Sequence, residues 1–198
     1  MQFSLLKAQR TSKKLSKKLK IFRGPLFLTF LGLSIFTFGI YNYYKVRILS
    51  FDSVPPEANK SIENVDSPVE IIIPSIKIDL KVEPGQIKDG VWQISGSSAT
   101  FLTTSAAPRT EGNMVIYGHN KKVIFGNLPY LSLGQRIVIK TKSGKIYNYV
   151  VDQKYFVGPD RVDLVSPSDK EELTIYTCYG LFDGQRAVIK ARPLKDSP

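Results

Sequence analysis

The chain has 198 residues, a formal net charge of +11, one Cys and one His. The length suits one domain of about 100–150 residues with an additional segment, and a hydrophobic content of 42% is enough for a folded core. One Cys excludes an intramolecular disulfide framework, and one Cys with one His excludes a zinc finger built from paired Cys and His ligands.

The positive charge is concentrated at the N-terminus. Residues 1–23 contain eight Lys and Arg residues and no Asp or Glu, whereas the remaining residues carry 20 basic and 17 acidic side chains, a net charge of +3. A basic arm is typical of nucleic-acid binding, but this arm directly precedes an apolar segment. Membrane topology therefore explains the arm, and we expect no nucleic-acid partner.

An uncharged run covers residues 24–44. As a helix with a rise of about 1.5 Å per residue, it would be roughly 30 Å long, the thickness of the hydrocarbon core of a bilayer. It is longer than the roughly 7–15 apolar residues of a cleaved signal peptide, and no clear A-x-A-like cleavage site follows. We predict a single-pass transmembrane helix, with residues 1–23 in the cytoplasm by the positive-inside rule and the following domain outside the cell membrane.

Residues 45–68 are rich in Pro, Ser, Asn and Glu and are predicted to form a flexible linker. From residue 69 onward, short apolar or alternating segments are separated by Gly, Pro and Asn, and Ser143-Gly144 predicts a hairpin turn. Short helical turns are expected within Lys122–Leu131 or Ala99–Ala107. Residues 69–198 are therefore predicted to be a mostly β domain, a barrel or sandwich, whose expected strands are Val69–Ile73, Ile76–Val82, Met114–Tyr117, Arg136–Thr141, Lys145–Val151, Leu173–Cys178 and Ala187–Ala191.

Three residues able to do chemistry are expected at strand ends. Cys178 ends one strand and Arg186 begins the next, so antiparallel pairing would place them side by side. His119 follows the strand that ends at Tyr117. A thiolate, an imidazole and a guanidinium are the groups needed for acyl transfer. On spacing alone, an inert buried thiol, an ordinary loop histidine and a surface arginine explain the pattern equally well.

The sequences around these three residues resemble those of sortases, which are membrane-anchored cysteine transpeptidases. Residues 174–178 (TIYTC) resemble the T-L-x-T-C signature of the family, and residues 117–120 (YGHN) resemble the segment with its catalytic His. Residues 185–188 (QRAV) resemble the start of the strand with its catalytic Arg. The order of the three motifs also matches, over residues 69–193. Ile175 replaces the usual Leu, and the loop after the Cys lacks the Pro of some classes, so no class is assigned.

The resemblance implies a closed β-barrel of about eight strands and a transpeptidation reaction. Cys178 would attack the Thr–Gly carbonyl of a C-terminal sorting signal of the LPXTG kind and form a thioacyl-enzyme. His119 would act as general acid and base, and Arg186 would hold the substrate carbonyl or oxyanion. An amine acceptor, from a cell-wall precursor or a pilin Lys, would resolve the intermediate. The implied partners are surface or pilin proteins that carry a sorting signal.

Two other function classes stay open at this point. A membrane-tethered cysteine peptidase would use the same Cys and His but let water resolve the acyl-enzyme, although papain-like enzymes have Cys before His in the chain. A membrane-tethered β-barrel could also bind a surface ligand without catalysis.

The sequence assigns no cofactor and no metal ion. Some sortases bind Ca²⁺ near an acidic loop, and carboxylates are suitable oxygen ligands for it. Because basic residues interleave the acidic residues before the cysteine strand, we expect an ordinary solvated loop there; these residues are Asp160, Asp163, Asp169, Glu171 and Glu172.

Overall fold

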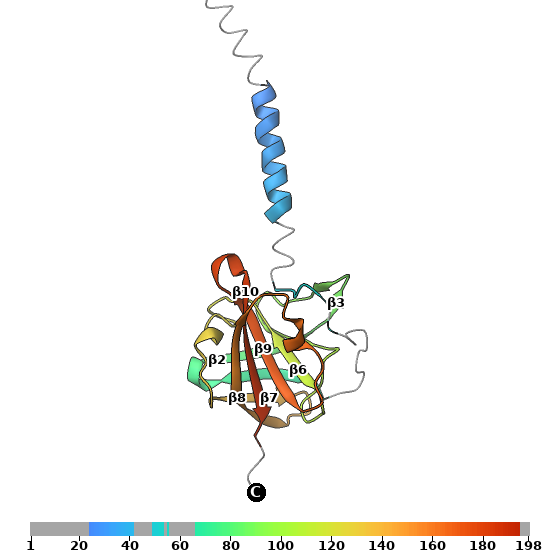
Figure 1. Ribbon diagram of the computed structural model, residues 1–198, viewed down its shortest axis with the longest axis vertical. Coiled ribbons are helices and arrows are strands. Elements are labelled where there is room, and N and C mark those ends of the chain that lie inside the picture. The colour runs from blue at the N-terminus through green and yellow to red at the C-terminus, as the bar shows by residue number, and fades with distance from the viewer. Residues whose placement is uncertain (1–23, 42–48, 54, 56–65, 195–198) are drawn as a thin grey trace, which may run out of the picture. The chain divides into compact units, whose positions relative to one another are not determined.

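The computed structural model describes residues 24–41, 49–53, 55 and 66–194, and the chain divides into two compact units, residues 1–46 and 47–198 (Figure 1). Within the described part of the first unit there is one helix, Gly24–Tyr41, whose large apolar side chains are all exposed. Its length and composition are those of a membrane span or a signal sequence. The basic arm and residues 42–44 of the predicted span lie outside the described residues.

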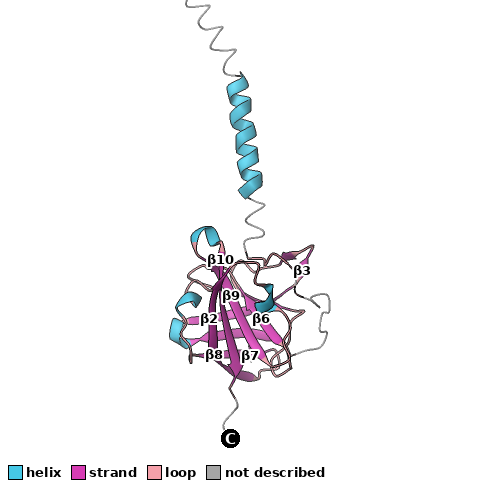
Figure 2. Ribbon diagram, in the orientation of Figure 1, coloured by secondary structure: helices cyan, strands magenta, loops and turns pink. Residues whose placement is uncertain are grey.

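The second unit is a closed β-barrel, shown as magenta strands in Figure 2. The strand order is β1-β2-β5-β6-β9-β10-β8-β7, and pairing of β1 with β7 closes the barrel. Two further short strands, β3 and β4, form a separate ribbon. The predicted eight-strand barrel is thereby confirmed. The strands are β1 (Pro68–Ile73), β2 (Ile78–Gly85), β3 (Ile87–Lys88), β4 (Val91–Trp92), β5 (Ala99–Leu102), β6 (Asn113–Tyr117), β7 (Arg136–Thr141), β8 (Ile146–Val157), β9 (Glu172–Tyr179) and β10 (Gln185–Pro193).

The seven expected strands are all present, and the differences have local causes. Ile76–Val82 begins only at Ile78, because Pro74–Ile76 form the short 3-10 turn η1. Ala99–Ala107, where a helical turn was considered, contains β5 instead. All four residues of β5 are buried, so the segment lacks the alternation that identifies a half-exposed strand. The other expected turn is found as η2 (Leu128–Tyr130).

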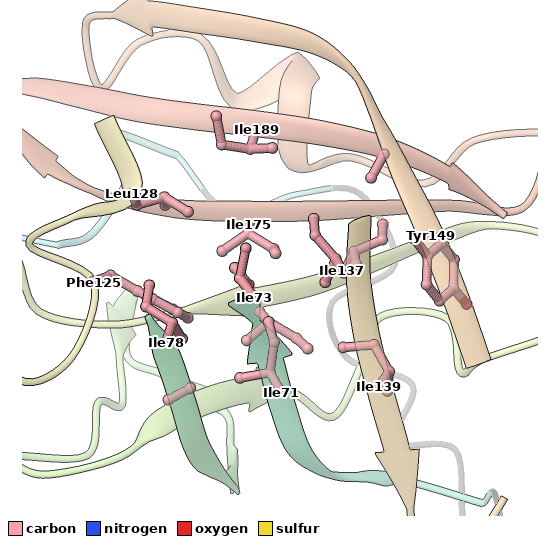
Figure 3. Packing of buried hydrophobic residues seen from close by; sticks show 14 of the residues in the cluster. Ile71, Ile73, Ile78, Phe125, Leu128, Ile137, Ile139, Tyr149, Ile175 and Ile189 are labelled. Carbon is pink, nitrogen blue, oxygen red and sulfur yellow. The ribbon is translucent and has the colours of Figure 1, made fainter. Parts of the chain in front are cut away.

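Isoleucine is the most frequent residue in the barrel interior, as Figure 3 shows for Ile71, Ile137 and others. Ile175 of β9 and Ile189 of β10 both point into this interior cluster. Because successive side chains of a strand point to opposite faces, Tyr176 and Cys178 lie on the outer face of the barrel wall. The inward packing of Leu173 and Ile175 therefore decides which face of β9 carries the thiol.

Burial of a tyrosine hydroxyl makes the barrel sensitive to alkaline pH. The Tyr149 hydroxyl donates to Glu171 Oε1 at 2.9 Å, and burial, with the nearby carboxylate, raises the pKa of Tyr149 far above its ordinary value. The native state keeps a proton that the unfolded chain loses near a pH of about 10, so the free energy of unfolding should fall above that pH by up to about 1.4 kcal/mol per pH unit.

Tyr149→Phe should remove that part of the pH slope in urea unfolding of the full chain in detergent. Tyr130→Phe, at a position with 76% exposure, is the matched control and should leave the slope unchanged. Equal slopes for Tyr149→Phe and the unmodified chain would contradict the assignment.

Candidate active site

The antiparallel pairing of β9 and β10 places two of the three predicted site residues directly opposite each other. Cys178 and Arg186 are register partners, with exposures of only 2% and 3%. The chain turns between them through the 3-10 turn η4 (Leu181–Asp183), in which Phe182 and Asp183 have φ angles of 51° and 58°. This left-handed backbone keeps the connection short, so the thiol and the guanidinium lie at one edge of the barrel.

The parallel pairing of β6 and β9 brings His119 to the same edge. Tyr117 and Tyr176 are register partners; Cys178 lies two residues further along β9, and His119 lies two residues beyond the end of β6. The Thr177 hydroxyl donates to the Gly118 carbonyl at 2.8 Å, which extends the pairing toward His119. His119 and Cys178 therefore lie at the same edge of the barrel, each two residues beyond an aligned pair of the β6–β9 ladder.

Gly118 is required at its position for steric reasons. A Cβ there would lie 2.9 Å from a ring carbon of Phe125 and 3.0 Å from a side-chain carbon of Ile124. The loop that follows is tied to the loop after β9, because the Asn120 amide donates to the Asp183 carboxylate at 2.5 Å. The two loops that bear His119 and precede Arg186 are therefore linked directly.

The Arg186 side chain is surrounded by carbonyl groups. Its Nη1 donates to the carbonyls of Asp183 and Gln185, both at 2.9 Å, and its Nη2 donates to the carbonyl of Ser50 at 2.7 Å. Ser50 was not singled out from the sequence, since it lies within the span predicted to be a flexible linker. Nη2 of Arg186 therefore already donates a hydrogen bond to a backbone carbonyl oxygen.

The residues around Ser50 are packed against the barrel. Leu49 and Phe51 have exposures of 2% and 3% and belong to a cluster on the outer face of the barrel wall. The sequence signal for this contact was the group of apolar residues at the start of the predicted linker, which includes Leu49 and Phe51. The linker boundaries remain a prediction, because most of 45–68 lies outside the described residues. We call this group the outer cluster; its buried members are Leu49, Phe51, Trp92, Leu102, Val115, Tyr117, Leu164, Val165, Tyr176, Cys178 and Val188.

Aromatic rings dominate the outer cluster beside Cys178. Tyr117 and Tyr176 are stacked with centroids 5.3 Å apart, and Trp92 of β4 meets both rings edge-on at 5.4 and 5.9 Å. Phe51 contacts Tyr176 edge-on at 4.9 Å. The sequence analysis did not identify Trp92, because β4 has two residues and carries no strand pattern.

Burial raises the pKa of the Cys178 thiol to about 12; the Arg186 guanidinium opposes this shift, and the Asp183 carboxylate adds to it. Desolvation disfavours the thiolate, and one nearby cation does not compensate for it. Burial of Cys178 therefore favours the neutral thiol over the thiolate.

The acidic loop before β9 uses its carboxylates in other contacts. Asp163 pairs with Arg161 at 2.8 Å, Glu172 pairs with Lys190 at 2.7 Å, and Glu171 accepts hydrogen bonds from Tyr149 and from the Arg109 amide. Within residues 24–41, 49–53, 55 and 66–194, no three His, Cys, Asp or Glu side chains gather in a metal-binding group.

A closed barrel that brings a thiol, an imidazole and a guanidinium to one edge has the groups of a cysteine acyltransferase. Residues 71–194 match the Sortase domain family, and the chain therefore belongs to the sortase family of cysteine transpeptidases. It is 28% identical over 140 residues to sortase A of Bacillus anthracis, a match that covers 69% of this chain and 64%, less than two thirds, of that relative. Over 71 residues it is 37% identical to the putative sortase YwpE of Bacillus subtilis strain 168, covering 34% of this chain and 69% of that protein.

Solved structures of two sortase types resemble the barrel. A lid mutant of sortase A from Corynebacterium diphtheriae has a TM-score of 0.57 and 25% identity, covering 69% of this chain and 75% of that one. Sortase C from Clostridium perfringens SM101 has a TM-score of 0.54 and 25% identity, covering 68% and 73%. The similar scores do not separate the classes, so the family is established and the class is not.

The raised pKa predicts how Cys178 reacts with iodoacetamide. Only the thiolate is nucleophilic, so between about pH 7 and about pH 10 the alkylation rate should rise about tenfold per pH unit without a plateau. The unfolded chain in urea is the control, and its rate should level off above a pH of about 9. A plateau already at neutral pH in the folded chain would instead indicate a resting thiolate.

Proposed function

We propose that this chain is a sortase-type transpeptidase that cleaves a C-terminal LPXTG-like sorting signal and transfers the cleaved protein to an amine. The observation that carries the proposal is the direct register pairing of Cys178 with Arg186, beside the β6 strand that leads to His119, in a barrel of the sortase family. The assigned roles are Cys178 as nucleophile, His119 as general acid and base, and Arg186 as the donor to the substrate carbonyl or oxyanion.

The reaction proceeds in two acyl transfers. His119 takes the proton of Cys178, and the sulfur attacks the carbonyl carbon of the Thr–Gly bond. The C–N bond breaks as His119 returns the proton to the leaving amine, which leaves a thioester on Cys178. An incoming amine then attacks the thioester carbonyl, its proton passes through His119, and the thiol is released.

Arg186 is suited to stabilise the developing oxyanion. Its Nη2 donates to the Ser50 carbonyl at 2.7 Å, so a carbonyl oxygen is accommodated at this nitrogen. A substrate carbonyl in the same place would gain a charge-assisted hydrogen bond that strengthens as negative charge develops. Ser50 must leave Arg186 for this to happen.

The neutral resting thiol favours proton transfer at the moment of attack over a preformed ion pair. Burial stabilises the protonated form of Cys178, and a bound substrate brings the carbonyl that the thiolate then attacks. This arrangement limits side reactions of the thiol when no substrate is present.

The acceptor distinguishes this proposal from that of a cysteine peptidase. Both mechanisms share the thioacyl-enzyme, and only transfer to an amine, in place of water, defines the transpeptidase. The proposed partners are surface or pilin proteins with a sorting signal, and the proposed acceptor is an amine of a cell-wall precursor or a pilin Lys.

The N-terminal helix supports a location at the cell membrane. Gly24–Tyr41 is long and apolar enough to span a bilayer, and the proposed span covers 24–44 with the basic arm 1–23 in the cytoplasm. The barrel, from residue 69 onward in the predicted domain division, would then act outside the cell.

Mass spectrometry of the full chain in detergent tests the proposed function. Incubation with LPXTG-like peptides should add the mass of the acyl fragment to Cys178, and added triglycine or a Lys-containing peptide should convert this adduct to the amide product. Cys178→Ala should give neither species. Hydrolysed peptide as the sole product at saturating amine would support the peptidase alternative instead.

Arg186→Ala should reduce kcat/KM by about 10²–10³-fold, which is typical of losing one oxyanion donor. Arg186→Lys should lose somewhat less, because a single ammonium cannot reproduce the planar guanidinium contacts. Arg136→Ala, which removes an exposed arginine at the start of β7, is the matched control and should be nearly silent. Turnover by Arg186→Ala at the unmodified rate would remove Arg186 from the mechanism.

A further inference from the structure

Apolar side chains protrude from two loops at the edge of the barrel that carries Cys178. Phe182 and Leu181 of η4 have exposures of 91% and 82%, and Val123, in the loop after His119, has an exposure of 75%. Among the described residues these are three of the four most exposed large apolar side chains. Such a concentration of exposed apolar side chains indicates an apolar partner.

The two loops form one surface because side-chain hydrogen bonds join them. The Asn120 amide donates to the Asp183 carboxylate at 2.5 Å, and the Asp183 carbonyl accepts from Arg186 Nη1 at 2.9 Å. Figure 2 shows η4 as a short turn that projects past the end of β10. We call Val123, Leu181 and Phe182 the apolar tip.

The chain enters the barrel at the same edge. Leu49 packs in the outer cluster with an exposure of 2%, and the Ser50 carbonyl accepts from Arg186 at 2.7 Å. Seven residues, 42–48, separate Leu49 from Tyr41 at the end of the apolar helix. A connection of this length reaches at most roughly 28 Å when fully extended. A helix that spans the bilayer therefore tethers this edge, and no other part of the barrel, by the shortest length of chain.

We propose that the apolar tip inserts into the surface of the membrane in which the chain is anchored. The partner is the interface of the bilayer, where lipid headgroups meet the acyl chains, and the edge with Cys178 and Arg186 faces this interface. The membrane location rests on the proposed function, whereas the affinity for lipid follows from the tip itself.

The shape of the tip favours a bilayer over a folded protein or an extended peptide as the partner. At exposures of 82% and 91%, Leu181 and Phe182 have almost no neighbouring protein surface, so a rigid partner would cover only one side of each. A fluid apolar phase surrounds a protruding side chain on all sides, and apolar side chains at the headgroup boundary are typical of interfacial segments.

The backbone of η4 is also suited to an environment with little water. The Asp183 amide donates to the Gly180 carbonyl at 3.3 Å, and the Gly184 amide donates to the Leu181 carbonyl at 3.1 Å. A peptide group with an internal partner does not have to give up a hydrogen bond to water when it enters lipid. The turn can therefore insert without unfolding.

Two exposed lysines, Lys121 and Lys122, directly precede Val123. The acidic residue of η4, Asp183, accepts a hydrogen bond from Asn120. Basic side chains beside apolar ones are typical of segments that bind anionic lipid surfaces. The lysines should strengthen insertion into vesicles that contain phosphatidylglycerol, and this contribution should decrease as salt is added.

Fluorescence quenching in vesicles measures insertion of the tip. In the full chain with Cys178→Ala, an NBD fluorophore is attached to the thiol of Phe182→Cys, and the chain is reconstituted in vesicles of phosphatidylcholine and phosphatidylglycerol. Interfacial segments lie about 5–10 Å into the headgroup boundary, so lipids with a nitroxide on the upper acyl chain should quench the NBD emission at least about twofold.

The same label at Ile146→Cys is the matched control. Ile146 has an exposure of 56% and begins β8, whose opposite end, Val157, pairs with Arg186. The control therefore reports on the far end of the barrel and should not be quenched. No quenching of the label at position 182, or equal quenching of both labels, would overturn the proposal.

Substitutions in the tip test which side chains insert. With NBD on Val123→Cys as the reporter, Leu181→Ser combined with Phe182→Ser should reduce quenching at least about threefold, because these two side chains supply most of the apolar area. Ile146→Ser should leave the quenching unchanged. Both exposed sites can be changed without unpacking the barrel, which an unchanged urea midpoint verifies. Full quenching in the double variant would contradict the assignment of the tip.

Kinetics in detergent separate a membrane contact from a substrate contact. If the tip binds lipid, Phe182→Ser should keep kcat/KM for soluble LPXTG-like peptides unchanged. A raised KM together with no quenching in vesicles would assign the tip to the peptide and overturn the proposal.

The outcome is also distinct from a failure of the proposed function. Quenching at position 182, in a chain that forms no thioacyl-enzyme when Cys178 is intact, would refute the transpeptidase and leave the membrane contact standing. Thioacylation without quenching would refute the membrane contact alone.

Discussion

The register between β9 and β10 is the constraint on which the candidate site depends. It sets Cys178 opposite Arg186 and, because Ile175 and Ile189 must face the barrel interior, it also decides that the thiol faces outward. A shift of one residue in either strand would send an isoleucine to the outer face and the thiol into the core. The packing of the interior and the geometry of the site are therefore specified by the same strand register.

The second pairing, between β6 and β9, is parallel and brings His119 to the same edge of the barrel. A parallel pair connects segments that are far apart in sequence. Here Tyr117 is aligned with Tyr176, and His119 follows Tyr117 by two residues. Gly118 lets the backbone approach the Phe125 ring closely, because a Cβ at this position would collide with the ring. Three segments meet at one edge because one strand, β9, is shared by both pairings.

Local patterns in the sequence were sufficient for the parts of this arrangement that lie on regular strands. The alternation and turn signals around residues 143–144 predicted the hairpin, and the strand-end positions of Cys178 and Arg186 predicted that these two residues would be paired. Patterns could not reveal β5, which is buried on both faces. They also could not reveal that Ser50 contacts Arg186, because a tertiary contact made by an isolated segment has no periodicity. The ring contacts of Trp92 in the outer cluster were missed for the same reason, since Trp92 lies on a two-residue strand.

The contact between Ser50 and Arg186 joins residues that are 136 positions apart. During synthesis, Ser50 emerges early and Arg186 is among the last residues of the barrel to appear, so the hydrogen bond forms only after nearly the whole domain has been made. Contacts of such large sequence separation form late, because the entropy of closing the intervening loop must first be overcome. The thiol is thus built into its buried setting by β9 and β10, and a nascent barrel without β10 lacks the Arg186 guanidinium that lies opposite Cys178. Order of synthesis, in this architecture, delays assembly of the reactive centre until the fold is complete.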